Sequence, residues 1–317
     1  MSDPNAHRKQ AVPEPHENDR WAVILAGGDG TRLKPLTRAI TGDDRPKQFC
    51  PVITDKTLFD QTQRRVALLF DQAQTFTVVT RTHERFYKAQ LKDWPVDRVL
   101  VQPENKGTVP AILLSLLAIA QLSPEAVVAF FPSDHYFSDD ARFMFQVGQA
   151  FELVEAHANL ITLLGIKPDR TEIQYGWIEP VNSSEEQGDR TLLRVRRFWE
   201  KPPRSVALKL MRGGSLWNTF VMIGHIKAFL EIISHTLPSL YSTLSSVAPV
   251  LRSHSEEEVL KDLYSHITPA NFSREVLELR PGALSVLQLS DVGWSDLGEP
   301  QRVAATFQYR QSTQPAS

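Results

Sequence analysis

Short apolar runs rich in β-forming residues alternate with helical patterns along the first half of the chain, and no other feature restricts the fold as strongly. Runs such as WAVILA, TFTVVT and AVVAFFPSD are separated by segments with apolar residues at helical spacing. Continuous apolar strands joined by helices are typical of a parallel sheet covered on both faces. With right-handed crossovers, the pattern predicts an α/β fold with a doubly wound, mostly parallel, Rossmann-like sheet. Ligands of such sheets bind beyond the carboxyl ends of the strands.

The second half of the chain has a more mixed pattern. Strands are predicted at YGWIEP, LLRVRRFWEKP and ALSVLQL, a helix is predicted at SVALKLMRG, and a polar, acidic turn separates the first two strands. Because no internal repeat or linker interrupts the pattern, residues 21–306 are predicted to form a single domain. Its elaborated C-terminal half should add the far wall of one cleft. Residues 1–20 are polar and proline-bearing and are expected to be a disordered lead-in, and residues 307–317 a loose tail.

The composition is that of an ordinary soluble globular protein, with 42% hydrophobic and 23% charged residues among 317. A net charge of −2 argues against nucleic-acid and membrane-surface partners, because no basic excess can neutralise a phosphate polymer. The lone cysteine, Cys50, excludes an intramolecular disulfide, and no apolar stretch before Trp21 resembles a secretory signal. We therefore expect a cytoplasmic protein that acts on small molecules, with Cys50 as a small buried residue rather than a nucleophile.

A glycine cluster follows the first predicted strand, in LAGGDGTRL. Its spacing fits neither the dinucleotide-binding fingerprint nor a Walker loop. Gly27, Gly28 and Gly30 lack a Cβ, so the backbone can approach a ligand closely and several N–H groups can converge on an anion. Arg32 adds a planar cation suited to phosphate oxygens, and Lys47 in RPKQF adds a second cation. The loop is predicted to bind phosphate, and a glycine turn with a surface arginine is the plain alternative.

Two aspartates stand where the pattern predicts loops. Asp134 ends the apolar strand VVAFF, and Asp296 lies in a loop bracketed by Gly293 and Gly298. Two carboxylates together with phosphate oxygens make a hard-oxygen site suited to Mg²⁺. A helix N-cap or a solvated turn is the structural alternative for these aspartates. His135 is expected to support its neighbours rather than to act as a metal ligand or a base.

A series of segments, in order along the chain, resembles the sugar-1-phosphate nucleotidyltransferases. They are VILAGGDGTRLKPLTR, RPKQF, QPENKGTVPAI, FFPSDHYF, YGWIEP, RFWEKP, LWNTFVMIG and VGWSDLG, which together span about residues 21 to 300. The PKQF form resembles the mannose-1-phosphate guanylyltransferase branch. The resemblance implies a nucleotidyltransferase, GT-A-like version of the predicted fold. It also implies a reaction in which a sugar-1-phosphate attacks a nucleoside triphosphate and expels pyrophosphate, with GTP and mannose-1-phosphate favoured.

The resemblance assigns roles to the residues that match these segments. Catalytic roles fall on Arg32, Lys47 and Lys201. Nucleotide-binding roles fall on Leu25, Ala26, Gly27, Gly28, Gly30, Thr31, Gln102, Asn105, Gly107 and Thr108. Sugar-phosphate-binding roles fall on Tyr175, Gly176, Glu200, Lys201 and Asn218. Asp134 and Asp296 are the implied Mg²⁺ ligands. Two structural alternatives stay open on the sugar side. Glu200 and Lys201 could be an exposed pair in a turn, and Gly176 in YGWIEP could mark a simple β-bulge.

Two features depart from the family's pattern. Asn218 is followed by Thr219 and Phe220, where the family usually has Asn-Ser-Gly, and this change bears on the sugar accepted more than on nucleotidyl transfer. The ring of Phe220 is expected to lie in the core, because it stands in the apolar run FVMIG. The chain also ends soon after VGWSDLG, whereas relatives often carry a further left-handed β-helix or cupin domain. Neither an isomerase activity nor a β-helix oligomerisation module is therefore expected, and the sequence leaves oligomerisation itself open.

Two other functions stay open at this point. One is the same reaction with another pair of sugar-1-phosphate and nucleoside triphosphate. The other is a non-catalytic regulatory paralogue that binds a nucleotide sugar. The joint presence of Arg32, Lys47, Asp134, Lys201 and Asp296 argues against the second.

Overall fold

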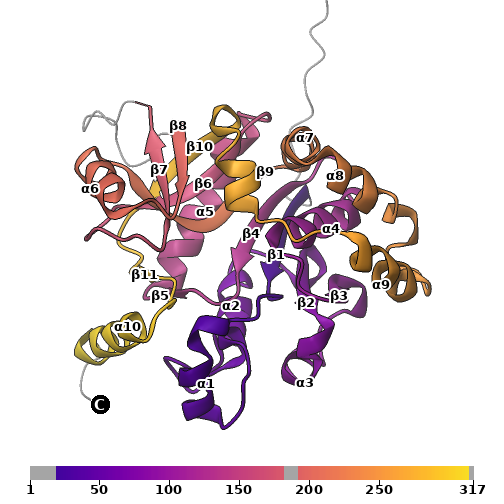
Figure 1. The fold of residues 1–317 in the computed structure, drawn as a ribbon, viewed down its shortest axis with the longest axis horizontal. Helices are drawn as coiled ribbons and strands as arrows, with labels where there is room; N and C mark the ends of the chain where they lie inside the picture. Colours follow the sequence, from indigo (N-terminus) through magenta and orange to yellow (C-terminus); the bar gives the residue numbers. More distant parts are fainter. Residues whose placement is uncertain (1–18, 182–191, 314–317) are drawn as a thin grey trace, which may run out of the picture.

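The computed structural model describes residues 19–181 and 192–313 (Figure 1). The predicted disordered lead-in lies outside the described residues except for Asp19 and Arg20. The acidic turn that follows YGWIEP lies outside them from residue 182 to residue 191, and so do the last four residues of the predicted tail.

A nine-stranded sheet organises the fold (Figure 1), with the strand order β3-β2-β1-β4-β9-β6-β10-β8-β7. Its strands are β1 (Arg20–Leu25), β2 (Thr75–Thr80), β3 (Val99–Gln102), β4 (Val127–Pro132), β6 (Ile161–Ile166), β7 (Gly176–Pro180), β8 (Leu193–Glu200), β9 (Leu216–His225) and β10 (Leu284–Leu289). A second sheet pairs β5 (Tyr136–Phe137) with β11 (Trp294–Ser295). This small sheet brings the segment after β4 beside the segment that carries Asp296.

Side chains that alternate along the strands divide between two core clusters on the two faces of the sheet. On β1, for example, Val23 belongs to one cluster, whereas Ala22 and Ile24 belong to the other. The first cluster is covered by α4 (Thr108–Ala120), α7 (Ile226–Thr236), α8 (Pro238–Ser245) and α9 (Glu256–His266). The second is covered by α2 (Leu58–Val66), α3 (Glu84–Tyr87) and α5 (Asp140–Glu155). The remaining α-helices of the described residues are α1 (Lys34–Thr41), α6 (Arg204–Arg212) and α10 (Pro300–Thr313).

The predicted doubly wound α/β fold is confirmed, and within its mixed sheet only β8 and β9 run against the direction of the other seven strands. Strands β3, β2, β1 and β4 run parallel to one another, whereas β9 runs antiparallel to both β4 and β6. Strands β7 and β8 also pair antiparallel. A continuous apolar run predicts a strand buried on both faces but says nothing of its direction, so the direction of β9 does not follow from the sequence pattern.

The apolar segment 108–120 forms a buried core helix, α4. All residues of α4 from 109 to 119 are buried. Pro110 lies in the first turn, where the missing N–H has no partner to lose. None of the helices in the described ranges has the length and the apolar character needed to cross a bilayer.

The end of the chain differs from the prediction of a loose tail after Thr306, because α10 continues to Thr313. Pro300 begins this helix, a position that proline favours. Val303 packs in one cluster with Leu33 and other apolar residues, whereas the ring of Phe307 is exposed. Because large apolar residues are few in this segment, it shows no clear apolar period, and the sequence pattern did not identify the helix.

The single cysteine is buried, as predicted. Cys50 has no exposed surface and lies in one apolar cluster with Val52 and Leu58. Burial raises the pKa of its thiol to about 11, so the reactive thiolate is scarce near neutral pH.

We therefore predict that 5,5′-dithiobis(2-nitrobenzoate) leaves the native protein unmodified over the time in which it fully modifies the protein in urea. In urea the reagent should titrate one thiol per chain, because unfolding both exposes the sulfur and restores its ordinary pKa. Absorbance of the released thiolate measures both rates. Equal rates in buffer and in urea would contradict the buried position.

Candidate active site

A cavity of about 370 Å³ opens at the carboxyl ends of β1, β3 and β4, where ligands of parallel sheets bind. Leu25, Gln102 and Pro132 are the last residues of these strands and line the cavity. Gly176 from β7 and Glu200 from β8 line it from the second half of the chain. The cavity thus lies where the predicted cleft was placed, with one wall from each half of the chain.

Most of the predicted site residues line this cavity. They are Leu25, Gly27, Gly28, Arg32, Gln102, Asn105, Gly107, Thr108, Asp134, Tyr175, Gly176, Glu200, Lys201, Asn218 and Asp296. Four predicted residues are not among the lining residues, namely Ala26, Gly30, Thr31 and Lys47. Ala26 has no exposed surface, and Lys47 is buried against the two aspartates. These four residues lie outside the cavity lining, and the roles assigned to them stay predictions.

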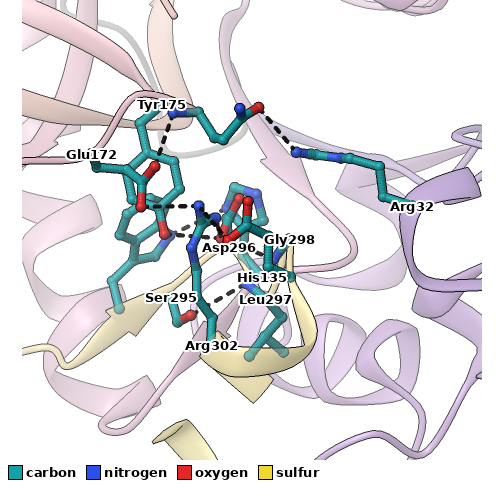
Figure 2. A network of polar contacts seen from close by, with 12 residues as sticks. Arg32, His135, Glu172, Tyr175, Ser295, Asp296, Leu297, Gly298 and Arg302 are labelled. Carbon is teal, nitrogen blue, oxygen red and sulfur yellow. Dashed lines mark hydrogen bonds and ion pairs between the residues drawn. The ribbon is translucent and has the colours of Figure 1, made fainter. Parts of the chain in front are cut away.

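The glycine loop after β1 is held by Gln48, a residue outside the predicted site. The side-chain amide nitrogen of Gln48 donates to the carbonyl oxygens of Ala26, at 3.2 Å, and Gly28, at 2.7 Å. Because these carbonyl oxygens are already engaged, the loop is better suited to bind an anion through its N–H groups. Arg32 follows the loop and reaches across the cavity, where its Nη1 lies 3.5 Å from Oε1 of Gln174 on the opposite wall (Figure 2).

The loop after β3 is fixed against a segment that comes much later in the chain. Gly107 has φ of 86° and ψ of −172°, a region that is essentially restricted to glycine. A Cβ at this position would lie 2.3 Å from the carbonyl oxygen of Ala270, which also accepts a hydrogen bond from the N–H of Val109 at 3.1 Å. This close contact brings Asn271 and Ser273 to the cavity.

Gln102 is nearly fully buried at the end of β3. Its side-chain oxygen accepts a hydrogen bond of 3.0 Å from the hydroxyl of Tyr264. Burial raises the pKa of Tyr264, so the phenol stays protonated and remains the donor. With the oxygen engaged, the NH₂ group of Gln102 is the part of the amide left to donate to a ligand.

Lys47 joins the two aspartates that the sequence placed near a metal. Its ammonium nitrogen lies 3.2 Å from Oδ2 of Asp134 and donates to the main-chain oxygen of Asp296. Burial alone would raise the pKa of Asp134, but the charge and hydrogen bond of Lys47, together with His135, outweigh burial, and the pKa lies below its ordinary value. Asp134 is therefore an anion at neutral pH, matched by a buried cation.

The carboxylate of Asp296 is the centre of a polar network (Figure 2). Its Oδ1 accepts hydrogen bonds from the hydroxyl of Tyr175 and the N–H of Gly298, both at 2.9 Å, and from Nη1 of Arg302 at 2.6 Å. Burial opposes ionisation of Asp296, but the neighbouring His135, Lys47 and Arg302 together lower its pKa below the ordinary value. Burial and this carboxylate raise the pKa of Tyr175, so its hydroxyl stays a donor.

His135 lies between the aspartates and an aromatic side chain. The indole N–H of Trp294 donates to its Nδ1 at 3.2 Å, and its Nε2 lies 3.7 Å from Oδ1 of Asp134. Burial lowers the pKa of His135, so the ring is neutral near pH 7. With Nδ1 as an acceptor, the remaining proton is on Nε2 and faces Asp134, which fits the supporting role expected for this histidine.

The sugar side of the predicted site contains a charged pair and an amide. Nζ of Lys201 lies 3.1 Å from Oε1 of Glu200, and the main-chain N–H of Lys201 donates to the carbonyl oxygen of Tyr175 at 3.1 Å. Asn218 is 7% exposed, and its Oδ1 accepts the N–H of Phe220 at 3.1 Å. Its NH₂ group donates to no other group among the described residues and is available to a hydroxyl group.

Phe220 adopts a backbone conformation that bulky residues rarely take, with φ of 62°. The pairing of β9 with β6 is irregular here, because the register shifts between Leu163 and Gly165. The hydroxyl of Thr219 bridges the irregularity: it donates to the carbonyl oxygen of Leu164 at 2.7 Å and accepts the N–H of Val221 at 3.2 Å. Phe220 was expected in the core, but its half-buried ring both packs on the core and lines the cavity.

Several cavity-lining residues were not predicted from the sequence. They are Gln48, Ala111, Pro132, Ser133, Gln174, Asn271, Ser273 and Trp294. The motifs recognised in the sequence include five of these residues and were the available signal for them: Gln48, Ala111, Pro132, Ser133 and Trp294. Asn271 and Ser273 stand in a polar segment without a motif, and only the tertiary contact at Gly107 brings them to the cavity.

Comparison with known proteins places this geometry in context. The profile of a family described as nucleotidyl transferase matches residues 21–312. The alginate biosynthesis protein AlgA of Pseudomonas fluorescens is 30% identical over 280 residues, which are 87% of this chain and 56% of AlgA. The mannose-1-phosphate guanylyltransferase of Escherichia coli (strain K12) is 28% identical over 288 residues, 88% of this chain and 58% of that protein. The chain thus spans little more than half the length of these curated relatives.

Solved structures show the same fold. A protein described as mannose-1-phosphate geranyltransferase from Thermus thermophilus is 26% identical with a TM-score of 0.79, covering 94% of this chain and 80% of that chain. A protein described as mannose-6-phosphate isomerase from Helicobacter pylori has a TM-score of 0.67 at 21% identity. The match covers 87% of this chain and 99% of the Helicobacter pylori chain. At this lower identity, the second similarity concerns the fold alone.

The contact at Gly107 leads to a prediction about stability. Gly107→Ala should lower the free energy of unfolding by about 1–3 kcal/mol, because alanine cannot adopt this φ and ψ without strain and its Cβ meets the carbonyl of Ala270. Urea unfolding measures the change. Gly282→Ala is the matched control, since a Cβ at Gly282 meets no atom within 4 Å. Equal stability of the two variants would contradict the contact.

Proposed function

This chain belongs to the nucleotidyl transferase family, and we propose that it transfers a nucleotidyl group from a nucleoside triphosphate to a sugar-1-phosphate. An oxygen of the sugar phosphate attacks the α-phosphorus, the bond to the β-phosphate breaks, and pyrophosphate leaves. The product is a nucleotide sugar. GTP and mannose-1-phosphate are the pair that we propose, giving GDP-mannose, and residues 21–306 are proposed to act as one domain.

The observation that carries this proposal is the convergence of Lys47, Asp134 and Asp296 beside the cavity. These residues come from three separate segments of the chain, and their charges meet within one small region. Arg32 lies in the glycine loop on one wall, and Lys201 lies on the other. A site with cations on both walls and carboxylates between them suits a reaction that joins two phosphate esters.

The chemistry requires two anions to approach each other. Their repulsion is offset by fixed cations, and the rate gain comes from positioning and from charge stabilisation in the transition state. We assign Arg32 to the triphosphate and Lys201 to the sugar phosphate. The attacking phosphate oxygen is already ionised near pH 7, so no side chain has to remove a proton from it. A neutral His135 is consistent with this.

A magnesium ion fits the two aspartates. Among the described residues, no group of three or more histidine, cysteine, aspartate or glutamate side chains is arranged to hold a metal. Mg²⁺ usually takes only one or two carboxylates and completes its shell with water and substrate phosphates. Asp134 and Asp296 both line the cavity, and Oδ2 of Asp296 accepts no hydrogen bond from another described residue. When bound there, the ion would neutralise charge on the transferring phosphoryl group.

The choice of GTP is supported by the relatives and by one side chain. The Escherichia coli relative is named as a mannose-1-phosphate guanylyltransferase. Tyr264 fixes the amide of Gln102 so that its NH₂ group is left to donate. Guanine presents acceptors at O6 and N7, whereas adenine shares the N7 acceptor but presents a donor at N6. We propose that the amide donor of Gln102 faces position 6 of the base, where it favours guanine over adenine.

A second candidate keeps the reaction but changes the sugar. Phe220 lines the cavity beside Asn218, and the family usually has glycine at the position of Phe220. An aromatic ring there reduces the space available to a sugar. This observation favours a narrower or different sugar preference and does not affect the assignment of the phosphate-binding residues.

The direct test is a matrix of the four common nucleoside triphosphates against several sugar-1-phosphates, with pyrophosphate release as the readout. We expect the highest kcat/KM for GTP with mannose-1-phosphate, and no release in excess chelator. A higher kcat/KM for pyrophosphate release with another sugar-1-phosphate would support the second candidate, which is the same reaction with a different sugar. A protein that binds GDP-mannose but releases no pyrophosphate with any pair would overturn the enzymatic proposal in favour of a non-catalytic paralogue.

Two cations are expected to matter for turnover. Arg32→Ala and Lys47→Ala should each lower kcat/KM by about 10²–10³-fold, the usual loss for one preorganised charge at a transition state, about 2.7–4 kcal/mol. Circular dichroism should show an intact fold. The matched controls are Arg64→Ala and Lys227→Ala, which remove exposed, ion-paired cations outside the cavity. Turnover of the Arg32 and Lys47 variants at the level of these controls would remove both residues from the mechanism.

Phe220 offers a prediction about specificity. Phe220→Gly should widen the range of accepted sugar-1-phosphates, because it opens the cavity beside Asn218. Its stability should fall by less than the roughly 3–5 kcal/mol typical of deleting a fully buried aromatic ring, since the ring is half-buried and glycine relieves the strain at φ of 62°. Phe220→Leu keeps the strained backbone with a smaller side chain and is the control. An unchanged sugar preference in both variants would show that the ring does not shape the pocket.

A further inference from the structure

We propose that Arg302 is a positioning residue for Asp296, and that it orients the carboxylate so that one oxygen stays available to a divalent cation in the cavity. This inference rests on the proposed function, since it concerns the same aspartate. Arg302 lies in α10, beyond the end of the motif VGWSDLG. No motif in the sequence pointed to it.

The contacts on Asp296 are concentrated on one of its two oxygens (Figure 2). Nη1 of Arg302 lies 2.6 Å from Oδ1, and the hydroxyl of Tyr175 and the N–H of Gly298 each donate to the same oxygen at 2.9 Å. Three donors on one oxygen fix both the position and the rotation of the carboxylate. Oδ2 accepts no hydrogen bond from the described residues, although the side chain lines the cavity. One oxygen is anchored, and the other remains for a ligand.

Arg302 is itself held on three sides. Its guanidinium carbon lies 4.5 Å from the centre of the Tyr175 ring. Its Nη2 lies 3.0 Å from a carboxylate oxygen of Glu172 and 3.7 Å from one of Glu299. A planar guanidinium can contact two carboxylates through different nitrogens while it stacks on a ring, and a lysine ammonium cannot reproduce that geometry. The orientation of Asp296 therefore depends on an arginine at this position.

Charge gives Arg302 a second effect on the same aspartate. The side chains of Asp296 and Glu172 are only 13% and 12% exposed, and that of Arg302 is 7% exposed. If the guanidinium were removed, two nearly buried carboxylates would lose the cation between them. Buried charges without a partner are costly, so Asp296 would be expected to turn toward other donors or toward water.

The loop itself is shaped around this pair. A Cβ at Gly298 would lie 2.5 Å from Oδ2 of Asp296 and 3.1 Å from Nη1 of Arg302. Glycine is the residue that leaves both the carboxylate and the guanidinium in place. The loop therefore leaves no room for a side chain between the two groups.

The test measures cation binding apart from turnover. Mn²⁺, a paramagnetic ion, is titrated into the full chain, and quenching of tryptophan fluorescence is recorded, since Trp294 lines the cavity near Asp296. Arg302→Gln should weaken Mn²⁺ binding by about 10–100-fold, the range found when a group that orients a metal ligand is removed. The Mg²⁺ concentration that gives half-maximal pyrophosphate release should rise similarly. Arg302→Lys, which keeps the charge without the planar fork, should recover part of the loss.

The matched control is Arg20→Gln, at the opposite end of β1. Arg20 is also ion-paired, at 2.7 Å from Glu155, and stacked on an aromatic ring, with its guanidinium carbon 5.4 Å from the centre of Phe151. This variant should lose stability in urea without any change in Mn²⁺ affinity. It separates the general cost of removing a paired arginine from a specific effect on the aspartate.

The outcomes separate this inference from the proposed function. If Arg302→Gln is destabilised but binds Mn²⁺ with the affinity of the unmodified chain, Arg302 is a structural contact of α10 and the inference is wrong. It is equally wrong if the unmodified chain shows no saturable quenching by Mn²⁺. If Mn²⁺ binding depends on Arg302 but no substrate pair yields pyrophosphate, the inference holds and the proposed reaction fails.

Discussion

The buried ammonium group of Lys47 is the contact on which the arrangement of the cavity depends. A lysine with so little exposed surface needs partners that replace water, since an unpaired buried charge is costly. Its partners are the carboxylate of Asp134 after β4 and the main-chain oxygen of Asp296. These groups come from segments far apart in the sequence. Folding that satisfies Lys47 therefore brings the loop after β4 and the loop after β11 to the same place.

Asp296 is held from two directions as a result. Lys47 contacts its main chain, whereas Arg302 contacts its side chain. The small sheet of β5 and β11 ties the same two loops together through main-chain pairing, with Trp294 opposite Phe137. Position and orientation of the carboxylate are thus determined by different groups. Contacts to both its main chain and its side chain fix this loop aspartate in place, as a site for charge stabilisation requires.

The sequence predicted those features that are encoded locally. The apolar run 75–80 gives β2 with the predicted bounds, and the glycine loop, Asp134 and Glu200 lie at strand ends as the pattern implies. Features that depend on distant contacts were missed. Gln48 stands in the motif RPKQF, but the sequence does not show that its amide binds two loop carbonyls. Asn271 reaches the cavity only because Gly107 allows the chain to pass closely. The direction of β9 is likewise a property of its neighbours and not of its own residues.

Phe220 shows where local preference and tertiary structure disagree. Its apolar surroundings predicted a core residue in a regular strand, but the register shift with β6 places it at φ of 62° with its ring at the cavity. A left-handed backbone costs a residue other than glycine roughly 1–2 kcal/mol, and here the hydrogen bonds of Asn218 and Thr219 stabilise it. Strain of this kind persists only where the surrounding structure enforces it, and it clusters at functional sites. The same irregularity directs both the amide of Asn218 and the phenyl ring of Phe220 toward the cavity. A sugar that binds to Asn218 must therefore fit beside this ring.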